Sequence, residues 1–234
     1  MAGVEIADWP SPNFGERRHG RRPELVVIHH TAMVSAEAAL ARLADPLAEV
    51  SAHYVVAEDG RVWRMVAEEA RAWHAGAGAW RGEADVNSRS IGIELANPGP
   101  LSGFPPFPEA QMAALEGLLD AVRERWKIPA AGVIAHSDMA PGRKADPGPK
   151  FDWRRLGLGG RALWPEPAEH AGGWEAFLAA AEAAGYPAPD GDRAPVLAAF
   201  RLRFRPWARG PLDRLDVGTM RGLAALTQAS AAIT

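Results

Sequence analysis

Strand-like and helix-like segments alternate over the first two thirds of the chain, and this alternation restricts the fold more than any other feature. The strand-like runs are short and apolar or alternating, whereas the helix-like runs repeat apolar residues every three or four positions. The pair Asp59-Gly60 between two of these strands predicts a hairpin. The whole pattern predicts an α/β fold with a mixed central β-sheet flanked by helices. The expected strands are 25–30, 52–57, 62–66, 90–95 and 133–136, and the expected helices are 35–47 and 109–127.

A break rich in proline, at residues 164–167, separates this region from the rest of the chain. The remainder contains three short segments with apolar residues at helical spacing, interrupted by Pro and Gly. We therefore expect an α/β domain over 1–164 and a small three-helix domain over 168–234. A module of roughly 65 residues is near the lower limit for a core that folds alone.

Charge and composition exclude several classes of function. The 26 basic and 29 acidic residues give a net charge of −3, which offers no attraction to nucleic acid. The chain has no Cys, so disulfides, thiolate metal sites, a cysteine nucleophile and a lipidated cysteine are all excluded. No apolar run is long enough for a membrane span, and no segment has the pattern of a signal peptide. These features favour a cytoplasmic protein, with a periplasmic location open if a signal has been removed.

Two histidines stand where predicted strands end. His29 follows the first apolar run, His136 follows the last, and Asp146 lies ten residues later in a loop rich in Pro and Gly. Open α/β sheets bind ligands at the carboxyl ends of their strands. Two imidazoles and one carboxylate leave a fourth position open, as in catalytic zinc sites, and Fe²⁺ is the chemical alternative. The structural alternative is a pair of capped strand ends and an Asx turn.

Five segments of the chain occur in a specific order. They are VIHHTA (27–32), SAHYVV (51–56), RAWHAG (71–76), SIGIE (90–94) and AHSDMAPGRKADPGP (135–149). Together they resemble the zinc-dependent N-acetylmuramoyl-L-alanine amidases of type 2, a family related to phage lysozyme-type amidases and to peptidoglycan recognition proteins. The resemblance extends from about residue 20 to residue 160 and implies the same mixed sheet with flanking helices.

The resemblance also implies a reaction and a set of site residues. His29, His136 and Asp146 would bind one Zn²⁺ per chain, and Glu94 and Lys144 would be catalytic. The reaction would be hydrolysis of the amide bond between the lactyl group of N-acetylmuramic acid and L-alanine of the stem peptide. Glu94, on the polar face of its predicted strand, can accept a proton from the attacking water. Lys144 can stabilise the oxyanion that develops on the carbonyl.

Peptidoglycan, or the 1,6-anhydro-muropeptides released during its recycling, is the implied substrate, with no nucleic-acid partner and no membrane segment. The expected substrate contacts are His30, Trp73, His74, Ala75 and Asn87. Trp80 is a further candidate for the wall of the substrate groove. The alternative to an enzyme is a non-catalytic peptidoglycan recognition protein, but such relatives typically lose a zinc ligand and this chain has all three.

The C-terminal segment resembles, more loosely, the three-helix peptidoglycan-binding domains. The stretches that suggest this are 185–187 and 196–206. The alternative is a helical bundle that packs on the catalytic domain without binding the cell wall. The sequence leaves both interpretations open.

Overall fold

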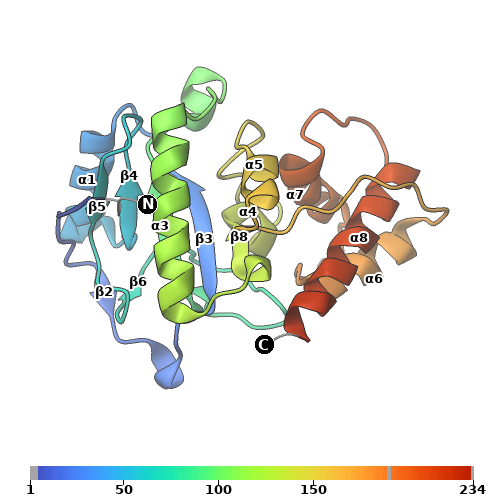
Figure 1. Cartoon of the computed structure of the whole chain (residues 1–234), viewed down its shortest axis with the longest axis horizontal. Coiled ribbons are helices and arrows are strands. Elements are labelled where there is room, and N and C mark those ends of the chain that lie inside the picture. The colour runs from blue at the N-terminus through green and yellow to red at the C-terminus, as the bar shows by residue number, and fades with distance from the viewer. Residues whose placement is uncertain (1–4, 189–190, 233–234) are drawn as a thin grey trace.

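The computed structural model describes residues 5–188 and 191–232, and its centre is a six-stranded sheet (Figure 1). The β4–β5 pair is antiparallel and the other neighbouring pairs are parallel. The sheet is therefore mixed, as predicted. In spatial order its strands are β1 (Ile6–Asp8), β5 (Val62–Arg64), β4 (Tyr54–Val56), β7 (Ser90–Leu95), β3 (Leu25–His30) and β8 (Val133–Ala135).

Strands β3 and β7, which are neighbours in the sheet, are almost completely buried. Leu25 to Ile28 of β3 are at most 1% exposed, which explains a run that is apolar on both faces. Strand β7 alternates, with Ile91, Ile93 and Leu95 fully buried on one face. The register pairs His29 with Glu94, so both side chains reach the carboxyl edge of the sheet.

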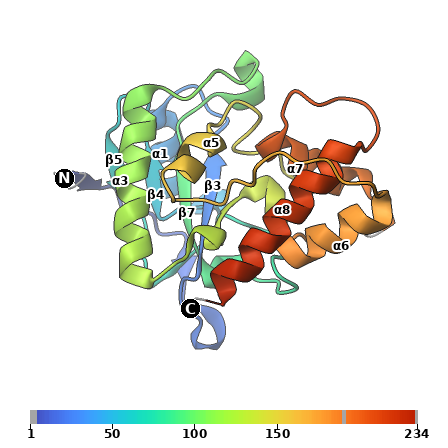
Figure 2. The same cartoon turned by 45° about the vertical axis from the view of Figure 1, so that its right-hand side comes forward.

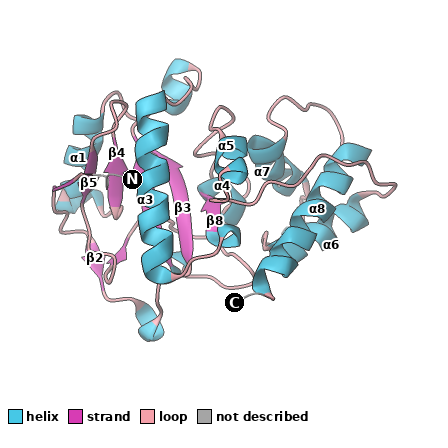
Figure 3. Cartoon of the chain, viewed as in Figure 1, coloured by secondary structure: helices cyan, strands magenta, loops and turns pink. Residues whose placement is uncertain are grey.

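Helices cover both faces of the sheet (Figure 3). Helix α3 (Glu109–Trp126) contributes Leu115 and Leu119 to the buried cluster that contains Ile28, Ile91 and Ile93 of the sheet. Helix α1 (Ala36–Ala44) covers part of the opposite face, and the Ser35 hydroxyl caps it by accepting a hydrogen bond from the Ala38 backbone N–H at 3.1 Å.

Shorter elements connect these layers. Strands β2 (Phe14–Gly15) and β6 (Arg71–Ala72) form a separate two-stranded sheet. The short helices are α2 (Val86–Arg89), α4 (His136–Met139) and α5 (Trp153–Leu158). The 3₁₀ turns are Arg18–Gly20, Pro46–Ala48, Gly99–Ser102 and Ala130–Gly132.

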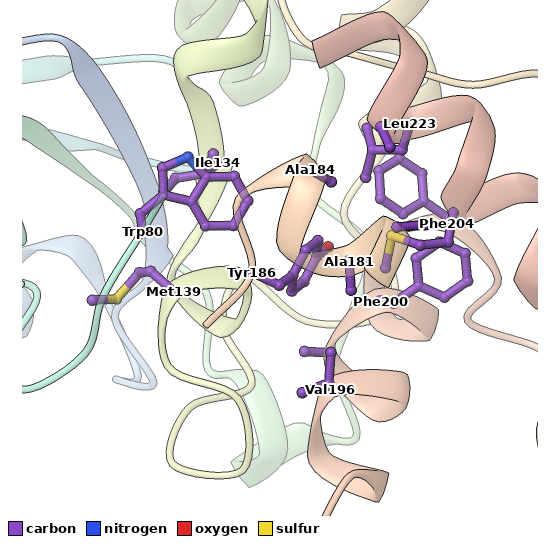
Figure 4. Close-up of a cluster of buried hydrophobic side chains, with 14 of the residues drawn as sticks. Trp80, Ile134, Met139, Ala181, Ala184, Tyr186, Val196, Phe200, Phe204 and Leu223 are labelled. Carbon is purple, nitrogen blue, oxygen red and sulfur yellow. The ribbon is translucent and has the colours of Figure 1, made fainter. Parts of the chain in front are cut away.

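The C-terminal segment forms the three predicted helices, α6 (Trp174–Ala184), α7 (Ala194–Phe204) and α8 (Arg214–Ala231). Helices α6 and α8 lie side by side in Figures 1 and 2. Their apolar side chains join those of β3, β8 and α4 in a single buried cluster, part of which Figure 4 shows. The helices thus cover the part of the sheet that α1 leaves open. Within the described residues, no helix combines the length and apolarity needed to cross a membrane.

The predicted fold class is confirmed, and the expected hairpin forms between β4 and β5. Several short elements of the described chain were not predicted, among them β1 and α4. Strand β1 extends the sheet at its edge although all three of its residues are exposed. Helix α4 begins immediately after β8, in a segment that we expected to be a loop.

Candidate metal centre and active site

Three candidate metal ligands meet at the carboxyl edge of the sheet. His29 comes from β3, His136 is the first residue of α4, and Asp146 lies in the loop that follows. The Nδ1 atoms of the two imidazoles are 2.9 Å apart, and each is 2.9 Å from Asp146 Oδ2. The fold therefore brings the predicted trio together, and in the described part of the chain these three residues form a group that could hold a metal ion.

The hydrogen-bond partner of His136 determines which of its nitrogens is free. Its Nε2 lies 2.9 Å from the backbone carbonyl oxygen of Ala75, and a carbonyl oxygen can only accept. Nε2 therefore carries a hydrogen. A ring with this single hydrogen has a lone pair on Nδ1, which faces His29 and Asp146.

A longer chain of hydrogen bonds gives the same result for His29. The Ser90 hydroxyl donates to the Val86 carbonyl oxygen at 2.6 Å, so its oxygen must accept from His74 Nε2 at 3.1 Å. Burial lowers the pKa of His74 well below its ordinary value, so the ring is neutral and its Nδ1 is an acceptor. That atom accepts from His29 Nε2 at 3.0 Å, which leaves a lone pair on His29 Nδ1.

With these tautomers, two imidazole lone pairs and one carboxylate oxygen converge on one point, and a metal cation there would bind all three atoms. Burial, followed by the charge of His136, lowers the pKa of His29 to about 4, so this ring is neutral at pH 7 as a metal ligand must be. Two nitrogen donors and one oxygen donor fit Zn²⁺. The residues therefore fit the metal that the family resemblance implies.

Glu94 lies beside this cluster, opposite His29 on β7. Its Oε2 atom is buried and has no hydrogen-bond partner. Burial, and then the negative charge of Asp146, raises the pKa of Glu94 to about 8, while Lys144 acts in the opposite direction. A bound cation would lower this pKa, toward the range in which a general base works near neutral pH.

These side chains line a cavity of about 550 Å³. Eight of the ten predicted site residues lie in its wall, together with residues of α1. The eight are His29, His30, Trp73, His74, Glu94, His136, Lys144 and Asp146. His30 is half-buried and packs edge-to-face on Phe104, at 6.1 Å between ring centroids.

Ala75 and Asn87 are not among the residues that line this wall, and substrate contact by them stays a prediction. Ala75 is 0% and Asn87 is 6% exposed. Asn87 Oδ1 accepts hydrogen bonds from the backbone N–H groups of His74 and Ala75, at 3.1 and 2.8 Å. Asn87 thus holds the segment that hydrogen-bonds both histidine ligands. Trp80 is also buried, against Tyr186, and forms no part of the cavity wall.

Sequence reasoning missed three residues that shape the site. Ser90 accepts from His74, and Gly92 leaves room for the His74 ring, because a Cβ there would lie 2.4 Å from its Cγ. Arg143 lines the cavity and donates to the Ala75 carbonyl oxygen at 2.7 Å. Ser90 and Gly92 precede Glu94 on the polar face of the same predicted strand. Their place on that face was the signal in the sequence that could have identified them.

A mixed sheet whose carboxyl edge holds two histidines and two carboxylates over a cavity defines an α/β enzyme with its active site at that edge. Comparison with known proteins gives the family. The model of the N-acetylmuramoyl-L-alanine amidase family matches residues 19–149, and the chain belongs to this family. The predictions of family and of enzyme class are confirmed.

Individual relatives agree with this. The chain is 41% identical over 157 residues to the N-acetylmuramoyl-L-alanine amidase AmiD of Escherichia coli; the match covers 62% of this chain and 56% of AmiD, little more than half of that relative. It is 33% identical over 170 residues to the 1,6-anhydro-N-acetylmuramyl-L-alanine amidase AmpD of Citrobacter freundii, covering 65% of this chain and 89% of AmpD.

Solved structures extend the similarity to the C-terminal helices. The complex of E. coli AmiD with its substrate anhydro-N-acetylmuramic acid-L-Ala-D-gamma-Glu-L-Lys superposes with a TM-score of 0.80 at 34% identity, covering 88% of this chain and 90% of that one. AmpDh3 of Pseudomonas aeruginosa gives a TM-score of 0.80 at 30% identity, covering 89% and 94%. A further AmpDh3 structure contains anhydromuramic pentapeptide.

Proposed function

We propose that this chain is a zinc hydrolase that cleaves the amide bond between the lactyl group of N-acetylmuramic acid and L-alanine of the stem peptide. One observation carries the proposal: three atoms that can bind a metal lie 2.9 Å from one another, and the unpartnered Oε2 atom of Glu94 belongs to the same cavity. The names of the relatives supply the bond that is cut.

His29, His136 and Asp146 would hold the zinc ion. When bound, the ion supplies a Lewis acid that polarises the scissile carbonyl and makes water more acidic. Glu94 accepts the proton of the attacking water at Oε2 and can deliver it to the leaving amine. Lys144 is exposed in the cavity wall, where its ammonium group can stabilise negative charge on the carbonyl oxygen.

The substrate class is peptidoglycan or its 1,6-anhydro-muropeptide fragments. The AmiD and AmpDh3 structures with anhydromuramyl peptides support this choice. Trp73 and His30 lie in the wall of the same cavity as Glu94 and are the proposed contacts for the sugar and peptide.

The alternative, a non-catalytic recognition protein, needs a cavity without the reacting groups. Here all three ligands and Glu94 face one cavity, which favours the enzyme.

Mass spectrometry of the products tests the proposal, with a defined anhydro-muropeptide and purified sacculi treated side by side. We expect a free stem peptide that begins with L-alanine and a muramyl product that ends in the lactyl carboxylate. Chelation should stop the reaction and added zinc should restore it. Cleavage inside the stem peptide, or no cleavage by the zinc-loaded protein, would contradict the proposal.

Two further expectations stay predictions. Residues 168–234 are expected to add affinity for the cell wall, which a pull-down with sacculi can measure. A cytoplasmic location is expected from the sequence pattern, and fractionation of the source cells can test it.

A further inference from the structure

The C-terminal helices share their core with the segment that carries a metal ligand. Met139 of α4 and Ile134 of β8 belong to the same buried cluster as Phe200 of α7 (Figure 4). His136 lies between Ile134 and Met139 in the sequence. The C-terminal helices therefore pack directly on the junction of β8 and α4, where His136 is placed.

A buried carboxylate, that of Asp138, links α4 to the C-terminal segment by hydrogen bonds of defined geometry. It is 0% exposed and lies two residues after His136 in α4. Within its own segment, Asp138 Oδ2 accepts a hydrogen bond from the Ala135 backbone N–H at 2.9 Å. From the C-terminal segment, Oδ2 also accepts from Arg203 Nη1 of α7 at 2.6 Å, and Oδ1 accepts at 2.8 Å from the hydroxyl of Tyr186, which follows α6.

Arg203 also contacts the backbone of β8 and of the segment that leads to the C-terminal helices. It donates to the carbonyl oxygens of Val133, in β8, at 3.3 Å and of Leu163 at 3.4 Å. Its guanidinium lies over the Trp153 ring, 4.0 Å from the centroid. One side chain from α7 thus contacts the strand before His136 and the helix turn after it.

Apolar packing alone could hold the helices against the sheet, and a buried ion pair is often no more stabilising than apolar residues of the same size. The Arg203–Asp138 ion pair and the other hydrogen bonds of Asp138 do more than stabilise, because they fix the position and orientation of α4 relative to α7. A metal site needs this, because ligand atoms must be held within about 0.5 Å of the productive geometry.

We propose that Arg203 and Tyr186 are positioning residues for the metal site, and that they act on His136 through Asp138. The inference rests on the proposed function, since it assigns His136 to a metal. It gives the C-terminal helices a part in building the active site, separate from any affinity for the cell wall.

The chain contains a matched control for Arg203. Arg201, two residues earlier in α7, pairs with the equally buried Asp216 at 2.5 Å and donates to the carbonyl oxygens of Gly210 and Pro211. This second pair joins α7 to α8 and does not touch α4. Lysine keeps the charge at either position but cannot make the forked contacts of arginine.

The experiment compares Arg203→Lys with Arg201→Lys in the full chain. Zinc affinity is measured by competition with a chelator, the ligand field by the absorption spectrum of the Co²⁺-substituted protein, and folding by melting temperature. We expect both variants to melt earlier. Only Arg203→Lys should bind zinc more weakly, by about tenfold, the lower end of the range for residues that orient metal ligands. Its Co²⁺ spectrum should change, and excess zinc should restore its turnover.

Zinc affinity and Co²⁺ spectra that match the wild type in Arg203→Lys would overturn the proposal and leave the helices as packing only. If Arg203→Lys does not fold, Tyr186→Phe, which removes a single hydroxyl group, decides by the same comparison with Arg201→Lys. A wild-type chain that binds no zinc would overturn the proposed function as well, so the two failures are distinguishable.

Discussion

Replacing Glu94 with glutamine separates its proposed role from a structural one. Glutamine keeps the length and shape of the side chain on β7 but cannot accept a proton. Positioned general bases contribute about 10²- to 10⁴-fold to rate, so kcat on a soluble muropeptide should fall by about 10²-fold or more. Zinc content should not change, because Glu94 is not among the three proposed ligands.

The raised pKa of Glu94 also predicts how the free energy of unfolding of the metal-free protein depends on pH. The pKa is about 8 in the folded chain against an ordinary value of 4.5. Between these values the folded state keeps a proton that the unfolded state loses, so stability falls as pH rises from 4.5 through 8. One pKa unit is worth about 1.4 kcal/mol, which gives an upper limit of about 5 kcal/mol. Because the Glu94 side chain is partly exposed to solvent, we expect roughly half of this free-energy change.

The assay is urea unfolding of metal-free wild type and Glu94→Gln at pH 5 and pH 9, with turnover and zinc content measured on the same preparations. We expect equal stability at pH 5 and a more stable variant at pH 9. Glu124→Gln, at an exposed position of α3, is the control for loss of a charge. Near-wild-type turnover with zinc bound would remove Glu94 from the mechanism, and equal stabilities at pH 9 would refute the raised pKa.

Three other predictions follow from the same geometry. The double variant His136→Ala, Asp146→Ala should retain no stoichiometric zinc, measured by elemental analysis, and full retention would refute the ligand set. Lys144→Met, which keeps the length of the side chain, should lower kcat by about 10²-fold if the ammonium stabilises the oxyanion; an unchanged kcat excludes that role. Ser90→Ala leaves His74 Nε2 without its acceptor and should weaken zinc binding by about tenfold in a chelator competition; wild-type affinity would contradict the hydrogen-bond chain assigned to His74.

The sequence was most informative where burial leaves a periodic signal. The apolar run before His29 and the alternation that ends at Glu94 predicted β3 and β7, and both strands are buried as expected. Strand β1 gave no such signal because its residues are exposed at the edge of the sheet. Helix α4 has only four residues, too few for a helical period to be visible.

The site residues at the ends of periodic strands could be predicted more reliably than those outside such strands. Residues at strand ends could be assigned to one edge of the sheet, because parallel strands end together there. Ala75 and Trp80 lie in irregular segments and Asn87 lies in the short helix α2, where no periodicity in the sequence shows which side chains face the cavity. The long-range hydrogen bonds of the fold decide that, such as those that Asn87 accepts from the backbone of His74 and Ala75.

In strand β7, every second residue belongs to the site. Its polar face presents Ser90, Gly92 and Glu94 in succession, and each has a different task. Ser90 accepts from His74, Gly92 gives the His74 ring its space, and Glu94 lines the cavity beside His29. A glycine in the middle of a buried strand weakens the strand, so its presence here is explained by the ring that packs on it.

Gly92→Ala tests this explanation without disturbing the backbone. Gly92 does not have the positive φ that would disfavour alanine, and the atoms nearest to the new methyl group belong to the His74 ring. The ring must move, which breaks its hydrogen bond with His29, and zinc affinity should fall by about tenfold or more. Gly15→Ala is the control, since the structure has no atom within 4 Å of a Cβ at that strand position. Wild-type zinc affinity in folded Gly92→Ala would show that the position of His74 does not control the metal site.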